Sequence, residues 1–308
     1  MSEAKLIRTL TQGLPSDDSV HVGPGDDCAV INTHKNEDLC LFKTDAIVEG
    51  IHFTADTRPE LIGRKAIARP LSDIAAMAGW PTHALITLGL PKNFTEAQLA
   101  AIYQGAQEMA AQHDTFIVGG ETTRTSELLI SVSLIGRCDP ATVITRDGSQ
   151  TGDAIFVTGE LGGSLAGRHL DFMPRLQESR WLSDRFDIHA MIDLSDGLAT
   201  DLHHLLNDQI GAELLTTSIP ISKAAKERAR ANPSGKTPLL AALTDGEDYE
   251  LLFTLPAKQA VSLHDEWKQS FQELSLKCIG KITRKPGISL RDENGAHSLN
   301  VKGYDHLK

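Results

Sequence analysis

The chain has 308 residues, of which 41% are hydrophobic and 23% are charged, and its formal net charge is −11. These values are typical of a globular protein with two domains of ordinary size. The acidic balance argues against nonspecific nucleic-acid binding, and no apolar run approaches the roughly 18 residues of a membrane span.

The first half of the chain predicts strands that alternate with helices, after an amphipathic helix over residues 2–10 that ends before Gly13. The spacing of apolar residues predicts a helix over residues 60–78 and a second helix capped by Thr95. Short apolar runs predict strands at residues 28–31, 39–42, 85–90, 116–118 and 128–135. This order indicates an α+β domain with a mostly antiparallel sheet and helices on one face.

The second half predicts another domain. Residues 139–152 are poor in large apolar side chains, and we expect them to link an N-terminal domain (1–138) to a C-terminal domain (153–308). The C-terminal domain is expected to be a sandwich-like α/β domain. Its predicted strands lie at residues 154–157, 190–192, 213–215, 249–254 and 277–279, and its predicted helices at residues 198–206, 222–231 and 257–269.

The four cysteines are scattered along the chain without CxxC spacing: Cys28, Cys40, Cys138 and Cys278. We therefore expect neither a disulfide framework nor a zinc site, but free, buried thiols in a reducing compartment. The amphipathic N-terminal segment lacks the apolar core of a signal peptide. These features predict a cytoplasmic protein.

Acidic side chains recur where an apolar run gives way to a turn or helix. The six segments are Gly25-Asp26-Asp27-Cys28, Thr44-Asp45, Ser72-Asp73, Gly119-Gly120-Glu121, Asp193-Leu194-Ser195-Asp196-Gly197 and Asp245-Gly246-Glu247-Asp248. One such cluster would be an ordinary turn. Six of them, spread over both halves of the chain, indicate carboxylates gathered around hard cations and hence phosphate chemistry.

Several of these residues also have an ordinary structural explanation. Asp27 could belong to a simple turn, although adjacent carboxylates repel each other and a cation relieves that repulsion. Asp73 could be a solvated helix residue, although its neighbours are apolar. Ser195 or Asp196 could cap a helix, whereas Asp193 ends an apolar strand, where a carboxylate needs a partner.

Several nucleotide-binding and hydrolase motifs are absent from the sequence. No GxxxxGK[ST], G-x-S-x-G or HExxH segment occurs. The Gly-rich segment 159–164 lacks the lysine of a P-loop, and we expect it to be a turn between a strand and a helix. His203 and His204 are adjacent on a predicted helix and point about 100° apart, which disfavours shared metal ligation.

Taken together, the acidic segments resemble those of the thiamine-monophosphate kinases. These kinases are members of a larger family that also holds aminoimidazole ribonucleotide synthetase, selenophosphate synthetase and a hydrogenase maturation factor. The similar segments run in order over nearly the whole chain and include residues 48–53 and 302–306. The resemblance implies ATP-dependent phosphorylation of thiamine monophosphate to thiamine diphosphate, with several magnesium ions. It also implies a homodimer in which two N-terminal sheets associate into a barrel.

The same resemblance implies roles for individual residues. The implied metal ligands are Asp27, Thr44, Asp45, Asp73, Glu121, Asp193 and Asp196. The implied ATP contacts are Gly120, Glu121, Arg146 and Ser195, and the implied acceptor contacts are His52, Glu247 and Val301. No general base is implied, because the attacking oxygen of the acceptor phosphate is already anionic.

Four positions depart from the family pattern. Lys43 stands where the family has a small hydroxyl residue, Glu121 replaces an aspartate, and Asp245 replaces a glycine. Val301 stands where related enzymes can offer an aromatic ring. The departures leave two alternatives open: a kinase or synthetase of the same superfamily with another small phosphorylated acceptor, or a nucleotide-binding relative without catalysis. Selenophosphate synthesis is disfavoured, because the first 25 residues contain no cysteine.

Overall fold

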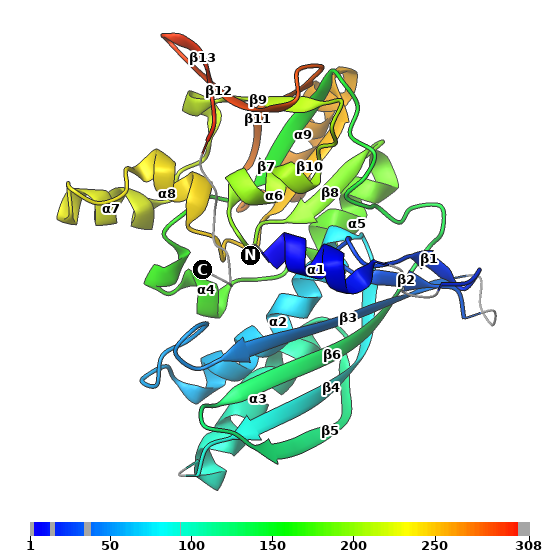
Figure 1. Ribbon diagram of the computed structural model, residues 1–308, viewed down its shortest axis with the longest axis vertical. Coiled ribbons are helices and arrows are strands. Elements are labelled where there is room, and N and C mark those ends of the chain that lie inside the picture. Colours follow the sequence, from blue (N-terminus) through cyan, green and yellow to red (C-terminus); the bar gives the residue numbers. More distant parts are fainter. Residues whose placement is uncertain (1–2, 13–15, 34–37, 93, 301–308) are drawn as a thin grey trace. The chain divides into compact units, whose positions relative to one another are not determined.

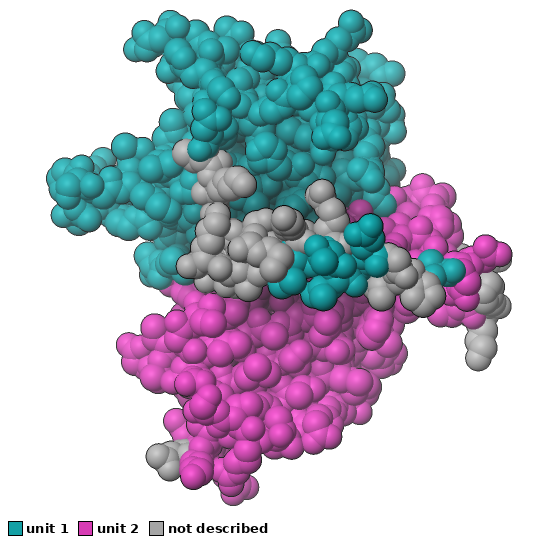
Figure 2. All heavy atoms as spheres, viewed as in Figure 1, with its two compact units in different colours: residues 1–16, 144–166, 181–308 teal, residues 17–143, 167–180 magenta. Residues whose placement is uncertain are grey.

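The computed structural model describes residues 3–12, 16–33, 38–92 and 94–300. The chain divides into two compact units, which Figure 2 shows in different colours. Unit 1 comprises residues 1–16, 144–166 and 181–308, and unit 2 comprises residues 17–143 and 167–180. The division into an N-terminal domain, a linker over residues 139–152 and a C-terminal domain stays a prediction.

Unit 2 is built on a six-stranded sheet in the order β1-β2-β3-β6-β4-β5. Neighbouring strands are antiparallel except β4 and β5, which are parallel. The elements are β1 (Val20–Val22), β2 (Ala29–Ile31), β3 (Leu39–Val48), α2 (Pro59–Ala76), β4 (Trp80–Leu90), α3 (Glu96–Gln112), β5 (Phe116–Arg124), β6 (Leu129–Cys138) and α4 (Arg168–Asp171). Helices α2 and α3 lie on one face of the sheet (Figure 1), which confirms the predicted α+β architecture.

The start of α3 follows from its sequence. The Thr95 hydroxyl accepts the N–H of Gln98 at 3.2 Å, and the Gln98 side chain accepts the N–H of Thr95 at 3.0 Å. This reciprocal capping box satisfies two backbone donors that the first turn of a helix leaves without partners. The cap predicted at Thr95 is therefore confirmed.

Unit 1 contains a seven-stranded sheet in the order β13-β12-β9-β11-β7-β10-β8, in which only β9 and β12 pair in parallel. Its strands are β7 (Asp153–Thr158), β8 (Ala190–Asp193), β9 (Gly211–Leu215), β10 (Leu251–Pro256), β11 (Leu276–Thr283), β12 (Gly287–Asp292) and β13 (Gly295–Ser298). Its helices are α1 (Glu3–Thr11), α6 (Leu198–His204), α7 (Lys223–Ala231), α8 (Pro238–Thr244) and α9 (Ala260–Ser270), with 3-10 turns η1 (Ser164–Ala166), η2 (Thr216–Ser218) and η3 (Ala257–Gln259). Helix α5 (Leu176–Arg185) is divided between the two units.

Strands β7, β8 and β10 of the unit 1 sheet are buried on both faces. All six residues of β7 are buried, as expected for a strand with apolar cover on each side. On one face, Ile155 and Val157 pack with α6 side chains. On the other, Phe156 stacks on Phe253 with ring centroids 5.8 Å apart. The predicted α/β character of this part of the chain is confirmed.

None of the helices in the described part of the chain has the length and apolar character needed to cross a bilayer. All four cysteines are free, as predicted; Cys28 and Cys138 are buried and Cys40 is half-buried, whereas Cys278 is exposed. Burial raises the pKa of the Cys138 thiol to about 12, so this group stays protonated at neutral pH.

Candidate active site

Two buried carboxylates of unit 2 lie close together. Asp27 follows a turn that leads into β2, and Asp73 lies in the last turn of α2. Each offers a carboxylate oxygen within 4.8 Å of the other, and both side chains are buried. The burial of Asp73 rules out the explanation of a solvated helix residue. Two buried oxygen ligands at this spacing suit a hard divalent cation such as magnesium.

Lys43 of β3 is the direct partner of Asp73. Its Nζ atom lies 2.6 Å from Oδ1 of Asp73, with 24% of the lysine side chain and 10% of the aspartate side chain exposed. Burial alone lowers the pKa of Lys43, but the carboxylates of Asp73 and Asp45 outweigh it and hold that pKa above its usual value. The ammonium group therefore stays charged and acts as the counter-ion of the buried carboxylates.

The alternation of β3 separates the two predicted ligands Thr44 and Asp45. Asp45 lies on the same face of the strand as Lys43, and its carboxylate is 3.3 Å from Nε of Arg69 in α2. Thr44 is exposed, and its hydroxyl accepts a hydrogen bond from Ser133 of β6 at 3.4 Å. The Thr44 hydroxyl is therefore on the other side of the strand from Lys43.

Gly120 and Glu121 lie on β5. A side chain at position 120 would place its Cβ atom 1.8 Å from the carbonyl oxygen of Ile86, so the close approach of β4 and β5 requires glycine there. Glu121 is exposed, and its carboxylate accepts the N–H of Thr122 at 2.8 Å.

His52 is held in one orientation by backbone and side-chain contacts. Its Nδ1 atom accepts the N–H of Val48 at 3.1 Å, so in the neutral ring Nε2 carries the proton. Lys65 of α2 donates to the His52 carbonyl at 2.7 Å and lies 2.9 Å from Nδ1 of His169 in α4. Lys65 is 0% exposed, and sequence reasoning missed it. The signal was a lysine within the apolar stretch of a predicted helix.

In unit 1, Asp193 ends β8 and is buried opposite Leu251 of β10. The following segment turns at Gly197, whose φ of +105° precedes the first residue of α6. The capping explanation for Ser195 and Asp196 is wrong, because Gly197 occupies the N-cap position. The carboxylate of Asp201 instead accepts the N–H groups of Asp196 (3.1 Å) and Gly197 (3.0 Å).

Asp201 is a buried neighbour of the predicted ligands that sequence reasoning missed. Its pKa lies well above the usual range because of burial, together with the negative charges of Asp196 and Asp193. The positive charge of Arg146 lowers the Asp201 pKa, so the Arg146 guanidinium group lies in the neighbourhood of Asp201. Unit 1 thus gathers three carboxylates and one arginine around the start of α6.

The loop of residues 245–249 runs beside the same segment. The N–H of Glu247 donates to the Ser195 carbonyl at 2.7 Å, and the N–H of Tyr249 donates to the Leu194 carbonyl at 2.8 Å. The carboxylate of Glu247 accepts the hydroxyl of Tyr249 at 3.2 Å. The predicted acceptor contact Glu247 therefore neighbours the predicted ATP contact Ser195. Val301 lies outside the described residues.

Comparisons with known proteins identify the family of the chain. The family described as AIR synthase related protein, N-terminal domain, matches residues 25–138, which contain Asp27, His52, Asp73 and Glu121. The thiamine-monophosphate kinase of Rhodopirellula baltica is 37% identical over 292 residues, which cover 92% of this chain and 89% of that protein. The chain belongs to the thiamine-monophosphate kinase family.

Two further family members extend the similarity over the full length. The thiamine-monophosphate kinase of Haemophilus influenzae is 34% identical and covers 100% of this chain and 98% of its own length. A solved structure of AaThiL in complex with AMPPCP and TMP superposes with a TM-score of 0.83 at 29% identity, over 99% of this chain and 97% of that chain. Both units of the chain therefore have counterparts in the family.

Proposed function

We propose that the chain transfers the γ-phosphoryl group of ATP to thiamine monophosphate and so forms thiamine diphosphate. The observation that carries the proposal is the full-length similarity to thiamine-monophosphate kinases. A relative of the same fold, AaThiL, binds AMPPCP, an analogue of ATP, together with TMP.

The reaction brings two anions together, and this decides what the protein must supply. Each pair of unit charges 4 Å apart repels by about 1 kcal/mol in water and by about 4 kcal/mol at an effective dielectric constant of 20. The attacking oxygen belongs to a phosphate and is already anionic, so the reaction needs no general base. Both units carry acidic side chains that can hold cations, which suits a reaction that needs charge screening and no general base.

We assign the magnesium-holding role to Asp27, Asp45 and Asp73 of unit 2 and to Asp193 and Asp196 of unit 1. Buried carboxylates fit magnesium by donor type, because this ion prefers oxygen ligands. Magnesium, when bound, would screen the repulsion between the two phosphate groups and align them for in-line transfer. Thr44 and Glu121 stay in the proposed set, although their side chains are exposed.

We assign ATP contacts to Gly120, Glu121, Arg146 and Ser195. Arg146 can place a positive charge beside a phosphate, and a glycine allows the backbone to approach a ligand closely.

We assign the acceptor contacts to His52, Glu247 and Val301. The Nε2–H of His52 can donate a hydrogen bond to the acceptor phosphate, because its Nδ1 atom is already occupied by the N–H of Val48.

We further propose that the chain forms a homodimer through the uncovered face of the unit 2 sheet. Phe42, Ile135, His83 and Phe116 are cross-strand neighbours on that face and are all exposed. Val118 and Leu85 are exposed as well. Contiguous exposed apolar side chains of this kind mark an association surface, and a second copy of the same sheet would cover them.

The test is direct measurement of thiamine diphosphate after incubation of the purified protein with Mg-ATP and thiamine monophosphate. Product formation supports the proposal, and its absence at high enzyme concentration contradicts it. The ion pair between Lys43 and Asp73 favours one other candidate, a nucleotide-binding relative without catalysis. Stabilisation by Mg-ATP in a thermal melt without release of ADP would identify that candidate. Turnover of another small phosphate, but not of thiamine monophosphate, would point to a different acceptor.

A further inference from the structure

The Gly-rich turn after β7 binds carboxylates of the chain itself. Gly162 and Gly163 have φ values of +80° and +72°, and consecutive N–H groups in such a turn form a concavity that binds anions. The N–H of Gly162 lies 3.0 Å from both carboxylate oxygens of Asp248, and the N–H of Gly163 donates to Asp245 at 2.9 Å. The hydroxyl of Ser164 also donates to Asp248. The turn is therefore occupied by two carboxylates that flank Glu247.

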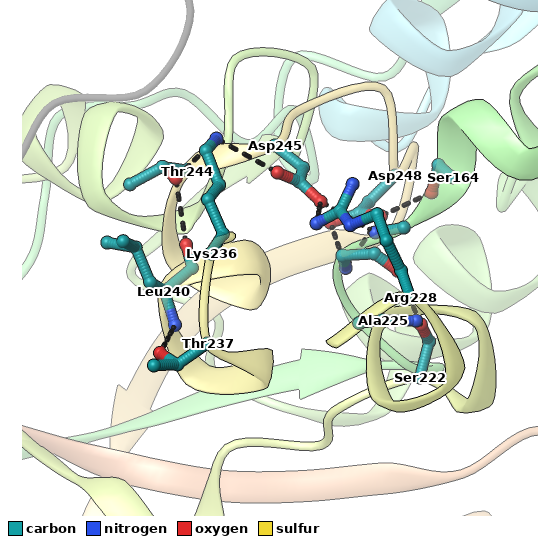
Figure 3. A network of polar contacts seen from close by, with 12 residues as sticks. Ser164, Ser222, Ala225, Arg228, Lys236, Thr237, Leu240, Thr244, Asp245 and Asp248 are labelled. Atoms are coloured by element: carbon teal, nitrogen blue, oxygen red, sulfur yellow. Dashed lines mark hydrogen bonds and ion pairs between the residues drawn. The ribbon is translucent and has the colours of Figure 1, made fainter. Parts of the chain in front are cut away.

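Asp245 makes a second set of contacts, with two cations. Nη2 of Arg228 lies 2.5 Å from its Oδ2 atom and Nζ of Lys236 lies 3.0 Å from its Oδ1 atom, while the Asp245 side chain is only 4% exposed. Figure 3 shows Arg228 and Lys236 approaching Asp245 from different sides. Asp245 is the C-cap residue of α8, where the helix dipole disfavours a negative charge. The positive charges of Arg228 and Lys236 offset this unfavourable interaction with the helix dipole.

Helix α7, which carries Arg228, is also tied to the Gly-rich turn. Ser222 is the N-cap of α7, and its hydroxyl donates to the carbonyl of Gly162. The N–H of Ser222 donates to the carbonyl of Leu161 at 3.0 Å. The turn, α7 and the 245–249 loop are thus connected pairwise. We call the contacts of Asp245 with Gly163, Arg228 and Lys236 the Asp245 brace.

The loop held by the Asp245 brace has an unusual backbone. Glu247 and Tyr249 adopt φ values of +57° and +50°, which residues other than glycine rarely adopt. Such a conformation persists only where the surrounding contacts enforce it. The brace holds one end of the loop, and the bonds to Leu194 and Ser195 hold its middle.

We propose that Asp245, together with Arg228 and Lys236, positions Glu247 for contact with the acceptor. The inference rests on the proposed function, since the thiazolium ring of a thiamine phosphate carries a positive charge that the Glu247 carboxylate complements. Asp245 itself touches no substrate in this account. It acts as a positioning residue through the backbone of the loop.

The experiment compares Asp245→Asn with a matched control, Glu213→Gln. Glu213 of β9 also lies between an arginine and a lysine, 2.8 Å from Arg291 and 3.6 Å from Lys281, but takes no part in the loop. Amide hydrogen exchange of residues 246–249 is measured without nucleotide, and KM is measured separately for thiamine monophosphate and for ATP. Arg228→Gln, which leaves Lys236 in place, provides a milder variant should Asp245→Asn fail to fold.

In Asp245→Asn we expect exchange at the Glu247 and Tyr249 amides to accelerate about tenfold and KM for thiamine monophosphate to rise about tenfold, the effect of a 1.4 kcal/mol change. KM for ATP should stay within about twofold, and Glu213→Gln should change none of these quantities. An unchanged exchange rate at these amides would contradict the claim that the Asp245 brace holds the loop. Faster exchange with an unchanged KM for thiamine monophosphate overturns the positioning role. A wild-type protein without kinase activity contradicts the proposed function and, with it, the role toward this acceptor, while the exchange data still decide whether Asp245 holds the loop.

Discussion

Replacement of Lys43 by methionine tests whether this lysine is the counter-ion of the buried carboxylates in the metal-free protein. Methionine has a similar length but carries no charge, so Lys43→Met leaves Asp73 buried beside Asp27 without its ammonium partner. We expect the variant to be less stable than the wild type in the absence of magnesium. We also expect magnesium to restore much of the lost stability, because the ion competes with Lys43 for the same carboxylate.

The magnitude follows from the geometry. At 2.6 Å and an effective dielectric constant of 20, the attraction between Lys43 and Asp73 is about 6 kcal/mol before desolvation is subtracted. The Asp73 and Asp27 carboxylate oxygens lie within 4.8 Å of each other, so their repulsion is at least about 3 kcal/mol on the same scale. Removing one partner of a buried pair typically costs about 3–5 kcal/mol. Because Lys43 is partly exposed, we expect a loss of about 3 kcal/mol.

The assay is urea unfolding of wild type and Lys43→Met in EDTA and in a magnesium titration. Arg137→Gln is the control, since Arg137 pairs with Asp38 at 2.8 Å but the two side chains are 51% and 36% exposed. We expect the control to lose less than about 1 kcal/mol and to show no response to magnesium. Equal stability of Lys43→Met and wild type in EDTA, or an equal response of both to magnesium, would refute the reasoning.

Four further predictions concern other parts of the molecule. Despite burial, the N–H of Gly163 and the cations Lys236 and Arg228 hold the pKa of Asp245 below its usual range, so Asp245→Asn should lose about 2 kcal/mol in urea unfolding at pH 7. This difference in stability between wild type and variant should vanish as the pH falls below about 3.9 and through the lower pKa of Asp245 in the folded state. A difference that persists at that pH would show that the negative charge of Asp245 is not its cause. Asp45→Asn should abolish thiamine diphosphate formation with an unchanged circular dichroism spectrum, and wild-type turnover would contradict its metal role. Lys65→Met, which removes the donor to the His52 carbonyl, should raise KM for thiamine monophosphate about tenfold but leave KM for ATP unchanged, whereas equal changes in both would indicate a general structural defect. Phe116→Glu should convert a dimer to a monomer in sedimentation velocity, and a persistent dimer would place the interface elsewhere.

Local sequence signals were sufficient where neighbouring residues determine the structure. The cap of α3 at Thr95 needs only Gln98, three residues further along the chain. The apolar run 154–157 predicted β7 because a strand that is buried on both faces is apolar at every position. By contrast, β1, β12 and β13 were missed because most of their residues are not buried and they contain no apolar run. The predicted strand 249–254 begins only at Leu251, since Tyr249 has a left-handed backbone.

The candidate site divides in the same way. The acidic residues could be identified from the sequence because they follow apolar runs, and Asp27 and Asp73 do lie close together. Lys65 was missed because its side-chain partner, His169, lies 104 residues away in the sequence. Asp201 was missed because its acceptor role toward the N–H groups of Asp196 and Gly197 depends on a turn that no local propensity specifies.

Lys43 shows where a departure from the family pattern needed a structure to interpret it. From the sequence, an ammonium group beside a metal site could point away or reach a phosphate. In the structure it binds Asp73 directly, so it offsets part of the negative charge of the buried carboxylates. Asp245 is a comparable case, because its carboxylate is balanced by two cations and a backbone N–H.

The most direct test of the account is one reaction: purified protein, Mg-ATP and thiamine monophosphate, with thiamine diphosphate and ADP quantified together. We predict equimolar formation of both products and no product when magnesium is removed with EDTA. ADP release without thiamine diphosphate, or no product at high enzyme concentration, would contradict the assignment of this chain as an active thiamine-monophosphate kinase.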